Sequence, residues 1–254
     1  MTIKKFRILK FKKKPILIAK KISKNFDRVV LNQISFEINK GEIFGILGPN
    51  GCGKTTLFSC LLGIHRLDHG DFFINGQSIK NLPIHIRAKR FMLSYVPQNS
   101  SCFLGMTVSE NIESICEIKI EDKIKRKDVL EEILARFSLE QIKTTLASRL
   151  SGGEKRRLSI GMALVTKPSL LLLDEPFSAL DPLSVETIRK IITDLQHSSI
   201  SVMLSDHNIS STLATCDRAI LISQGSVVAS GLPREIVNNR VARKLYFGES
   251  FKFN

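Results

Sequence analysis

The chain has 254 residues, 43% of them hydrophobic, and a formal net charge of +14 at pH 7. At about 150 residues per domain, this length gives one large domain or two small ones, and no apolar run approaches the roughly 18 residues of a membrane span. The five cysteines show no metal-ligand spacing and no disulfide framework, so the totals predict a soluble chain that needs partner subunits for any work in a membrane.

The positive charge is concentrated near the amino terminus. Residues 1–24 contain ten Lys or Arg and no acid, which leaves 28 basic and 24 acidic residues, a balance of only +4, for the rest of the chain. We interpret residues 1–15 as a basic arm, either a solvated tail or a segment that meets anionic lipid headgroups. A charge confined to one end does not indicate a nucleic-acid groove, so no nucleic-acid partner is expected.

Strand patterns dominate the first part of the chain. From about Ile16 the segments "ILIAKKI", "LNQISFEI" and "EIFGIL" read as strands, and a glycine-rich loop and a helix at about 55–64 follow. "DFFINGQSI" predicts a strand that runs into an Asn-Gly turn at 75–76, and "FMLSYVPQ" predicts a strand that ends at Pro97.

The middle of the chain has helical spacing instead. Apolar residues in 107–166 recur at the period of a helix, with little strand signal. Beyond them "SLLLLD", "ISVMLS", and "RAILIS" with "SVVAS" predict strands, and "PLSVETIRKIITDLQHS" predicts an amphipathic helix. Apolar strands that alternate with helices indicate an α/β fold whose mainly parallel sheet is covered on both faces.

The segment "GPNGCGKT" matches the phosphate-binding pattern G-x-x-x-x-G-K-[ST] and lies between a predicted strand and a predicted helix, as that pattern requires. Its glycines let backbone N–H groups point at phosphate oxygens beside a helix N-terminus. Lys54 would reach the β- and γ-phosphates of ATP, and Thr55 would hold Mg²⁺. The candidate nucleotide-binding residues of this segment are Gly48, Pro49, Asn50, Gly51, Cys52, Gly53, Lys54, Thr55 and Thr56.

An acidic pair follows a buried strand in "LLLLDEP". Asp174 stands at the carboxyl end of that strand, where ligands bind in open α/β sheets, and would order Mg²⁺ through its water shell. Glu175 beside it would polarise the water that attacks a phosphate, which is the base that hydrolysis needs. Next to a phosphate-binding loop, the pair predicts an ATPase.

A third candidate site is the segment "LSGGEKRR". Ser151, Gly152 and Gly153 at the start of a helix offer a hydroxyl, N–H groups and the positive helix end to an anion. Taken alone, the segment is equally well explained as a simple helix cap, and both interpretations stay open.

Together the three segments resemble the ABC ATPase family. The resemblance implies a P-loop NTPase cassette over 16–254, with a mainly parallel core sheet and an antiparallel β subdomain. It also implies an all-α subdomain at about 107–166 that carries the signature, and a carboxyl-terminal tail at about 240–254. ATP and Mg²⁺ are the implied cofactors, and two cassettes would close head to tail. Ser151 and Gly153 of one would contact the γ-phosphate held by the other, so one chain alone would be an incomplete enzyme.

Four further residues occupy positions that this family uses. Gln98, after "YVP", stands where the family senses γ-phosphate and Mg²⁺, and Asp181 in "SALD" stands where it faces the opposite subunit. His207 in "LSDHN" has the position of the switch histidine, so the implied catalytic residues are Glu175 and His207. Phe26 stands where an aromatic ring stacks on adenine, and an ordinary packed Phe is nearly as good an explanation because the hydroxyl often found there is missing.

Four segments are similar to the ATPases of lipopolysaccharide export, namely 82–90, 174–185, 206–225 and 245–253. The similarity implies a homodimer beneath two transmembrane subunits, which hold it peripherally on the cytoplasmic face of a Gram-negative inner membrane. Importer ATPases for branched-chain amino acids are close in sequence and remain the alternative, although importers of this type generally lack the tail.

Two other classes fit less well. Nucleic-acid-associated ABC ATPases usually place a long coiled coil between the phosphate loop and the signature, and the interval from Lys54 to Leu150 leaves no room for one. A regulatory cassette that binds ATP without turnover would not need the intact Glu175 and His207.

The segment "QNSSCFLGM" at 98–106 places the apolar Phe103 in a loop where polar residues are the norm. It joins the Gln98 position to the predicted helices, where family members receive a short helix from the membrane subunit. An exposed apolar side chain suits such helix-in-groove docking, so we interpret Phe103 as a partner-docking residue. The alternative is a ring folded back into the helical subdomain.

Overall fold

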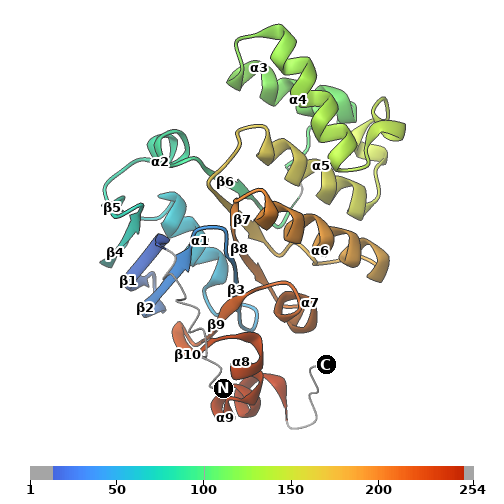
Figure 1. The fold of residues 1–254 in the computed structure, drawn as a ribbon. Coiled ribbons are helices and arrows are strands. Elements are labelled where there is room, and N and C mark those ends of the chain that lie inside the picture. The colour runs from blue at the N-terminus through green and yellow to red at the C-terminus, as the bar shows by residue number, and fades with distance from the viewer. Residues whose placement is uncertain (1–13, 100, 249–254) are drawn as a thin grey trace, which may run out of the picture.

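The computed structural model describes residues 14–99 and 101–248; the basic arm up to residue 13 and the last six residues of the predicted tail lie outside this part. Two β-sheets pack against each other, and a group of helices extends from the larger sheet, with α5 (Gly152–Leu164) beside it and α3 (Val108–Lys119) and α4 (Lys123–Arg136) farther out (Figure 1). Within the described residues, no helix combines the length and the apolar character needed to cross a membrane.

The smaller sheet is antiparallel and has the strand order β2-β1-β4-β5. Its strands are β1 (Pro15–Asn25), β2 (Val29–Asn39), β4 (His69–Ile74) and β5 (Gln77–Ser78). The predicted turn joins β4 to β5, and Asn75 and Gly76 both have positive φ, as a tight hairpin requires. This sheet is the antiparallel β part that the family resemblance implied.

The larger sheet is parallel except at one edge and has the strand order β10-β9-β3-β8-β7-β6. Only β9 and β10 pair antiparallel within its described strands. The strands are β3 (Ile43–Leu47), β6 (Leu93–Val96), β7 (Leu170–Asp174), β8 (Ser201–Asp206), β9 (Arg218–Ser223) and β10 (Ser226–Gly231). Every residue of β3, β7 and β8 is buried, which confirms the prediction of a mainly parallel sheet covered on both faces.

The helices connect these strands and cover the larger sheet. They are α1 (Lys54–Leu62), α2 (Ile84–Phe91), α3 (Val108–Lys119), α4 (Lys123–Arg136), α5 (Gly152–Leu164), α6 (Pro182–His197), α7 (Ile209–Leu213), α8 (Pro233–Asn238) and α9 (Arg240–Ala242). Two 3₁₀ turns (Glu140–Ile142 and Ala147–Arg149) and a π-helical turn (Arg243–Phe247) complete the regular elements of the described chain.

The core has two parts, one on each face of the larger sheet. Phe44 and Ile46 of β3 pack with Phe58 of α1 and with the smaller sheet. Ile43 and Leu47, which alternate with them along β3, belong to the cluster that contains α6 and the helical group α3–α5. Because successive residues of a strand point to opposite faces, one short apolar strand holds both halves of the molecule together.

Two element boundaries and one helix differ from the sequence predictions. α1 ends at Leu62 rather than Ile64 because Gly63 takes a left-handed conformation and its N–H caps the helix. The strand predicted in "FMLSYVPQ" starts later, because Met92 forms the left-handed cap of α2. The sequence pattern did not predict α2, whose buried residues are only the charged Arg87 and the apolar Phe91, too few for an apolar stripe.

Candidate functional site

The strand register brings the candidate functional segments to one edge of the larger sheet. Leu47 at the end of β3 pairs with Asp206 at the end of β8, and Ser205 pairs with Asp174 at the end of β7. β6 runs parallel to β7 and ends beside it. The loops that follow these strands therefore start side by side, at the carboxyl edge where open α/β sheets bind ligands.

Residues 48–56, the phosphate loop, connect β3 to α1 and curl around their own lysine. Lys54 is 5% exposed, and its Nζ donates hydrogen bonds to the carbonyl oxygens of Gly48 at 2.8 Å and Pro49 at 3.1 Å. The middle of the loop, Asn50 and Gly51, is exposed. The loop thus already holds the ammonium group against two of its own carbonyl oxygens.

The amino end of α1 is open to an anion. Gly53 is the N-cap with a φ of 108°, no side chain caps the helix, and the first turn carries no acidic residue. A Cβ on Gly53 would come within 2.8 Å of the carbonyl oxygen of Val30, so this position cannot carry a side chain. Thr55 and Thr56 add hydroxyls to the first turn. The N–H groups of that turn and the positive end of the helix suit the phosphates of ATP.

Asp174 is buried at the end of β7 with both carboxylate oxygens engaged. Ser205 donates its hydroxyl to Oδ1, and Tyr95 donates its hydroxyl to Oδ2 at 3.3 Å. Burial and the neighbouring carboxylate raise the pKa of Tyr95, which keeps its hydroxyl protonated at neutral pH. Sequence reasoning missed both partners, because they stand on other strands and no sequence pattern assigned either of them a role.

Glu175 is the meeting point of three segments. Its Oε2 accepts a hydrogen bond from Nε2 of Gln98 at 2.9 Å and lies 3.2 Å from Nδ1 of His207. Its backbone has a φ of 49°, which non-glycine residues rarely adopt, and its N–H donates to the carbonyl oxygen of Ser205 at 2.7 Å. Glu175 is 9% exposed, whereas the side chain of His207 is 47% exposed. The carboxylate is therefore oriented from two sides and shielded, and the imidazole faces outward.

The donor set beside the phosphate loop suits a magnesium ion that arrives with a nucleotide. No group of three or more His, Cys, Asp or Glu in the described chain could hold a metal by itself. Mg²⁺ keeps several waters and takes one or two protein oxygens together with substrate phosphates. Thr55, Gln98 and Asp174 supply a hydroxyl, an amide oxygen and a carboxylate of that kind.

Arg156 of α5 ties the acidic pair to the segment of Gln98. It is 8% exposed, and its guanidinium donates to the carbonyl oxygens of Pro97 at 3.0 Å, Gln98 at 2.8 Å and Glu175 at 3.2 Å. Sequence reasoning missed this residue as well. Only the orientation of α5 distinguishes it from Arg157, whose guanidinium bonds other carbonyl groups.

The signature segment, residues 151–153, caps α5. Ser151 Oγ accepts from the N–H of Glu154 at 3.3 Å, and the Glu154 carboxylate accepts from the N–H of Ser151 at 2.8 Å, which is a reciprocal capping box. Ser151 and Gly152 are exposed, and Gly153 is buried. Ser151 therefore caps the helix, as one of the two interpretations expected. The other stays open, because the exposed end of α5 could also meet an anion.

Asp181 lies beside the signature segment. A Cβ on Gly153 would collide with the side chain of Ser184, whose N–H donates to Asp181 at 3.0 Å as the N-cap of α6. Among the described residues, no hydrogen bond joins 151–153 or Asp181 to the phosphate loop. One chain thus carries the phosphate loop with its acidic pair and, as a separate group, the signature with Asp181.

Phe26, at the turn between β1 and β2, is 52% exposed and is not a core residue. His65 meets its ring edge-on with the centroids 5.2 Å apart, and Lys24 Nζ lies 5.2 Å from the ring centroid. Lys24 is itself fixed by an ion pair with Asp68 at 2.9 Å. A half-exposed ring held in this way is suited to stack on a base.

Phe103 presents its ring from an anchored loop. Its N–H donates to Oδ1 of the buried Asn111 at 2.7 Å, and its carbonyl oxygen accepts from Nδ2 of Asn111 at 3.1 Å. The ring is 50% exposed, so it does not fold back into the helical core. With Ile115, Met162 and Ala163 it lines a groove of about 250 Å³, which we call the Phe103 groove.

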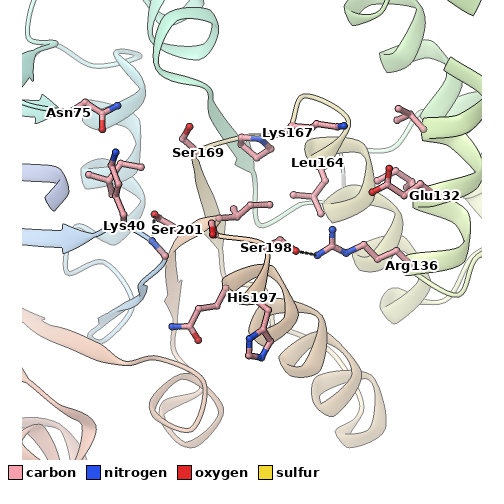
Figure 2. Close-up of a pocket in the computed structure, with 18 residues that line it drawn as sticks. Lys40, Asn75, Glu132, Arg136, Leu164, Lys167, Ser169, His197, Ser198 and Ser201 are labelled. Carbon is pink, nitrogen blue, oxygen red and sulfur yellow. Dashed lines mark hydrogen bonds between the residues drawn. The ribbon is translucent and has the colours of Figure 1, made fainter. Parts of the chain in front are cut away.

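A larger cavity of about 1000 Å³ lies at the opposite edge of the sheet, where Ser169 and Ser201 stand at the starts of β7 and β8. Figure 2 shows Arg136 reaching across it from α4 to Ser198, to which it donates at 3.0 Å. This cavity shares no residue with the phosphate loop or the acidic pair. It does not belong to the candidate site.

Comparisons with known proteins agree with this geometry. The sequence profile of the family described as ABC transporter matches residues 31–178. The lipopolysaccharide export system ATP-binding protein LptB of Haemophilus influenzae is 41% identical over 239 residues, which are 93% of this chain and 99% of that protein. LptB of Escherichia coli strain K12 is 40% identical over 238 residues, 93% of this chain and 98% of that protein.

A solved structure has the same fold. It is cbiO1 from Clostridium perfringens, described as part of the ABC transporter complex cbiONQ. Its TM-score is 0.82 at 28% sequence identity, over 91% of this chain and 94% of that one.

Proposed function

The chain belongs to the ABC transporter family of ATP-hydrolysing subunits, and from this premise we propose that it powers the extraction of lipopolysaccharide from a Gram-negative inner membrane and its export to the outer membrane. One observation carries the choice of substrate. Identity of 40–41% to the LptB proteins runs through 93% of this chain and 98–99% of theirs, and so extends beyond the family match at 31–178.

ATP is bound at the phosphate loop. Lys54 exchanges its hydrogen bonds to the carbonyl oxygens of Gly48 and Pro49 for bonds to phosphate oxygens, which charge makes stronger. Phe26 stacks on the base with its exposed ring. Mg²⁺, when bound beside Thr55, Gln98 and Asp174, would neutralise charge that develops on the phosphate oxygens.

Glu175 acts as the general base. Its carboxylate takes a proton from the attacking water as the oxygen of that water bonds to the γ-phosphorus and the bond to ADP breaks. Gln98 and His207 hold the carboxylate in one orientation. The low exposure of Glu175 excludes competing solvent, so its negative charge acts on the one water in reach.

A second copy of the chain completes the enzyme. Within the described residues, the exposed Ser151 and Gly152 and the adjacent Asp181 have no hydrogen bond to the phosphate loop of their own chain, although the hydroxyl and N–H groups of 151–152 suit a phosphate. In a head-to-tail homodimer the signature segment of each chain covers the ATP of the other. ATP binding then closes the dimer, and hydrolysis reopens it.

Two transmembrane subunits receive this motion at the Phe103 groove. The half-exposed Phe103 ring that lines the groove belongs to the loop that begins at Gln98, which bonds Glu175. A helix seated in the groove is therefore linked through this loop to movements of the catalytic carboxylate. Through these partners the homodimer sits peripherally on the cytoplasmic face of the inner membrane.

Reconstitution tests the choice of substrate. The chain is co-expressed with its membrane subunits, the complex is placed in liposomes that contain lipopolysaccharide, and release of the lipid to a periplasmic acceptor protein is measured. We expect release that requires ATP and that is lost with Glu175→Gln. A complex that copurifies with a solute-binding protein and drives ATP-dependent uptake of a branched-chain amino acid would instead establish an importer.

Phe103→Ala is expected to weaken assembly with the membrane subunits by about 30-fold, since removing an aromatic anchor from an interface commonly costs about 2 kcal/mol or more. Folding and ATP binding should be unchanged, because the loop backbone is held by Asn111 rather than by the ring. Pull-down of the membrane subunits at graded concentrations, with thermal melting of the isolated chain, measures both effects.

Leu232→Ala is the matched control for this variant. Leu232 is 52% exposed, close to the 50% of Phe103, and it precedes α8 at the far end of the chain from the groove. It should leave assembly unchanged. Equal assembly by wild type and Phe103→Ala would rule out the docking role.

A further inference from the structure

Arg87 is a buried cation on α2, and its hydrogen-bond partners within the described residues are all backbone carbonyl groups. It is 4% exposed. Its Nη1 donates to Cys60 at 2.9 Å and Leu61 at 2.7 Å, its Nε donates to Leu82 at 2.7 Å, and its Nη2 donates to Lys80 at 3.1 Å. Burying a guanidinium is costly, and such groups are normally paired with a carboxylate.

No carboxylate forms an ion pair with Arg87 in the described part of the chain. Burial lowers the pKa of the guanidinium and the nearby Asp71 opposes that effect, and an arginine remains charged at neutral pH in either case. Asp71 favours the charge of Arg87 without forming an ion pair, and the groups that bond the guanidinium are the four carbonyl groups.

Two of those carbonyl groups, on Cys60 and Leu61, belong to the last turn of α1. The last carbonyls of a helix have no partner inside the helix, and together they carry its partial negative charge. A cation at this end is stabilised by the helix dipole. Arg87 bonds two of these acceptors at once, and Cys60 also accepts from the N–H of Gly63 at 3.1 Å. The opposite end of α1 carries the phosphate loop and Lys54.

Gly63 makes this arrangement possible. It ends α1 with a φ of 86°, and a Cβ there would come within 2.9 Å of the guanidinium carbon of Arg87. The chain turns away from the helix without a side chain, so the guanidinium lies directly on the helix end. Arg87 also bonds Leu82 and Lys80, which precede its own helix, and so it joins α1 to the segment that leads into α2.

The length of α1 makes its far end important for the site. Nine residues at 1.5 Å each span only about 13 Å, which is a stiff rod of two and a half turns. A small tilt or shift at the carboxyl end moves the amino end, where Lys54 and Thr55 stand, by a comparable amount. Holding the carboxyl end therefore holds the phosphate-binding end.

We propose that Arg87 is a positioning residue for nucleotide binding, which clamps the carboxyl end of α1 and so sets the place of the phosphate loop at the other end. The proposal rests on the phosphate loop being the ATP site. It assigns a role in the proposed reaction to a residue that lies outside the phosphate loop, the acidic pair and the signature segment.

The test compares Arg87→Met with Arg90→Met in the isolated full chain. Arg90 lies on the same helix but is exposed and bonds only the side chain of Gln77, at 2.9 Å, among its hydrogen bonds in the described chain. The Kd of MgADP is measured by calorimetry below the melting temperature of every variant, and kcat and KM for ATP are measured in the assembled complex.

We expect Arg87→Met to raise the Kd of MgADP and the KM for ATP by about tenfold, with kcat changed much less, because the loss falls on binding rather than on the base. Arg90→Met should match wild type. Arg87→Lys should lie between them, since one ammonium group keeps the charge but cannot reach four carbonyl groups. If Arg87→Met does not fold, the Kd and KM of Arg87→Lys test the proposal instead.

A lowered melting temperature with the Kd and KM of wild type, in either Arg87 variant, would show a purely structural role and overturn the proposal. Wild-type binding of MgADP, and its loss in a Lys54 variant, tests the ATP site separately. A failure of the ATP site is therefore distinguishable from a failure of the clamp.

Discussion

Replacing Glu175 with Gln is expected to lower kcat for ATP hydrolysis by about 10³-fold or more while ATP still binds, because general-base catalysis contributes about 10²–10⁴-fold and an amide cannot take the proton. Gln has the same shape, so the contacts to Gln98 at 2.9 Å and to His207 at 3.2 Å can persist in altered form. The left-handed backbone at this position is no more strained by Gln than by Glu.

Phosphate release and nucleotide calorimetry on the same preparation separate the two effects. The variant should trap ATP and stay dimeric under conditions in which wild type turns over. Gln98→Ala is a useful companion, since it removes one support of the carboxylate and leaves the base itself, and its loss of kcat should be smaller. Turnover by Glu175→Gln at even a tenth of the wild-type rate would place the base elsewhere.

Lys54→Met is expected to weaken the binding of MgADP by about 100-fold, or about 2.8 kcal/mol, because hydrogen bonds that involve a charged group each contribute about 1.5–3 kcal/mol. The variant also removes the two bonds from Nζ to Gly48 and Pro49 that hold the loop in its curled shape. Met fills nearly the same volume in a position that is 5% exposed, so no cavity complicates the result.

Lys40→Met is the matched control for this variant. Lys40 is exposed and precedes β3, whereas Lys54 follows it, so the two lysines stand at opposite ends of one strand. Calorimetry with MgADP should show wild-type affinity for Lys40→Met and almost no heat for Lys54→Met at micromolar protein. Wild-type affinity in Lys54→Met would mean that the loop binds phosphate through its backbone alone.

Much of the fold follows from local sequence patterns. The apolar strands and the amphipathic helix at 182–197 were predictable because alternation and helical spacing report which face of an element is buried. α2 was not predicted, because its buried residues are only Arg87 and Phe91, and one apolar position does not make a stripe. Arg87 and Arg90 look alike in the sequence, and only packing shows that Arg87 bonds the end of α1 while Arg90 is exposed and bonds Gln77.

In the candidate site, too, some residues are recognisable from a local sequence pattern and others are not. Gly53, Lys54 and the acidic pair are recognisable one segment at a time, because a phosphate loop and a carboxylate at a strand end carry their chemistry within a few residues. The Glu175 cluster is different: Gln98 is 77 residues and His207 is 32 residues away along the chain, and the family resemblance, not the residues themselves, suggested that they act together.

The sequence by itself therefore determined the chemistry of this protein, a loop that binds phosphate and an acid that follows a buried strand, since both depend on short-range backbone conformation and residue type. The tertiary structure alone decided which side chains support that chemistry. Strand order and register set Tyr95 and Ser205 on Asp174, and helix orientation turns Arg156 to the backbone of Glu175. These contacts join residues from separate elements, and their formation depends on how the two sheets and the helices pack, which no local pattern encodes.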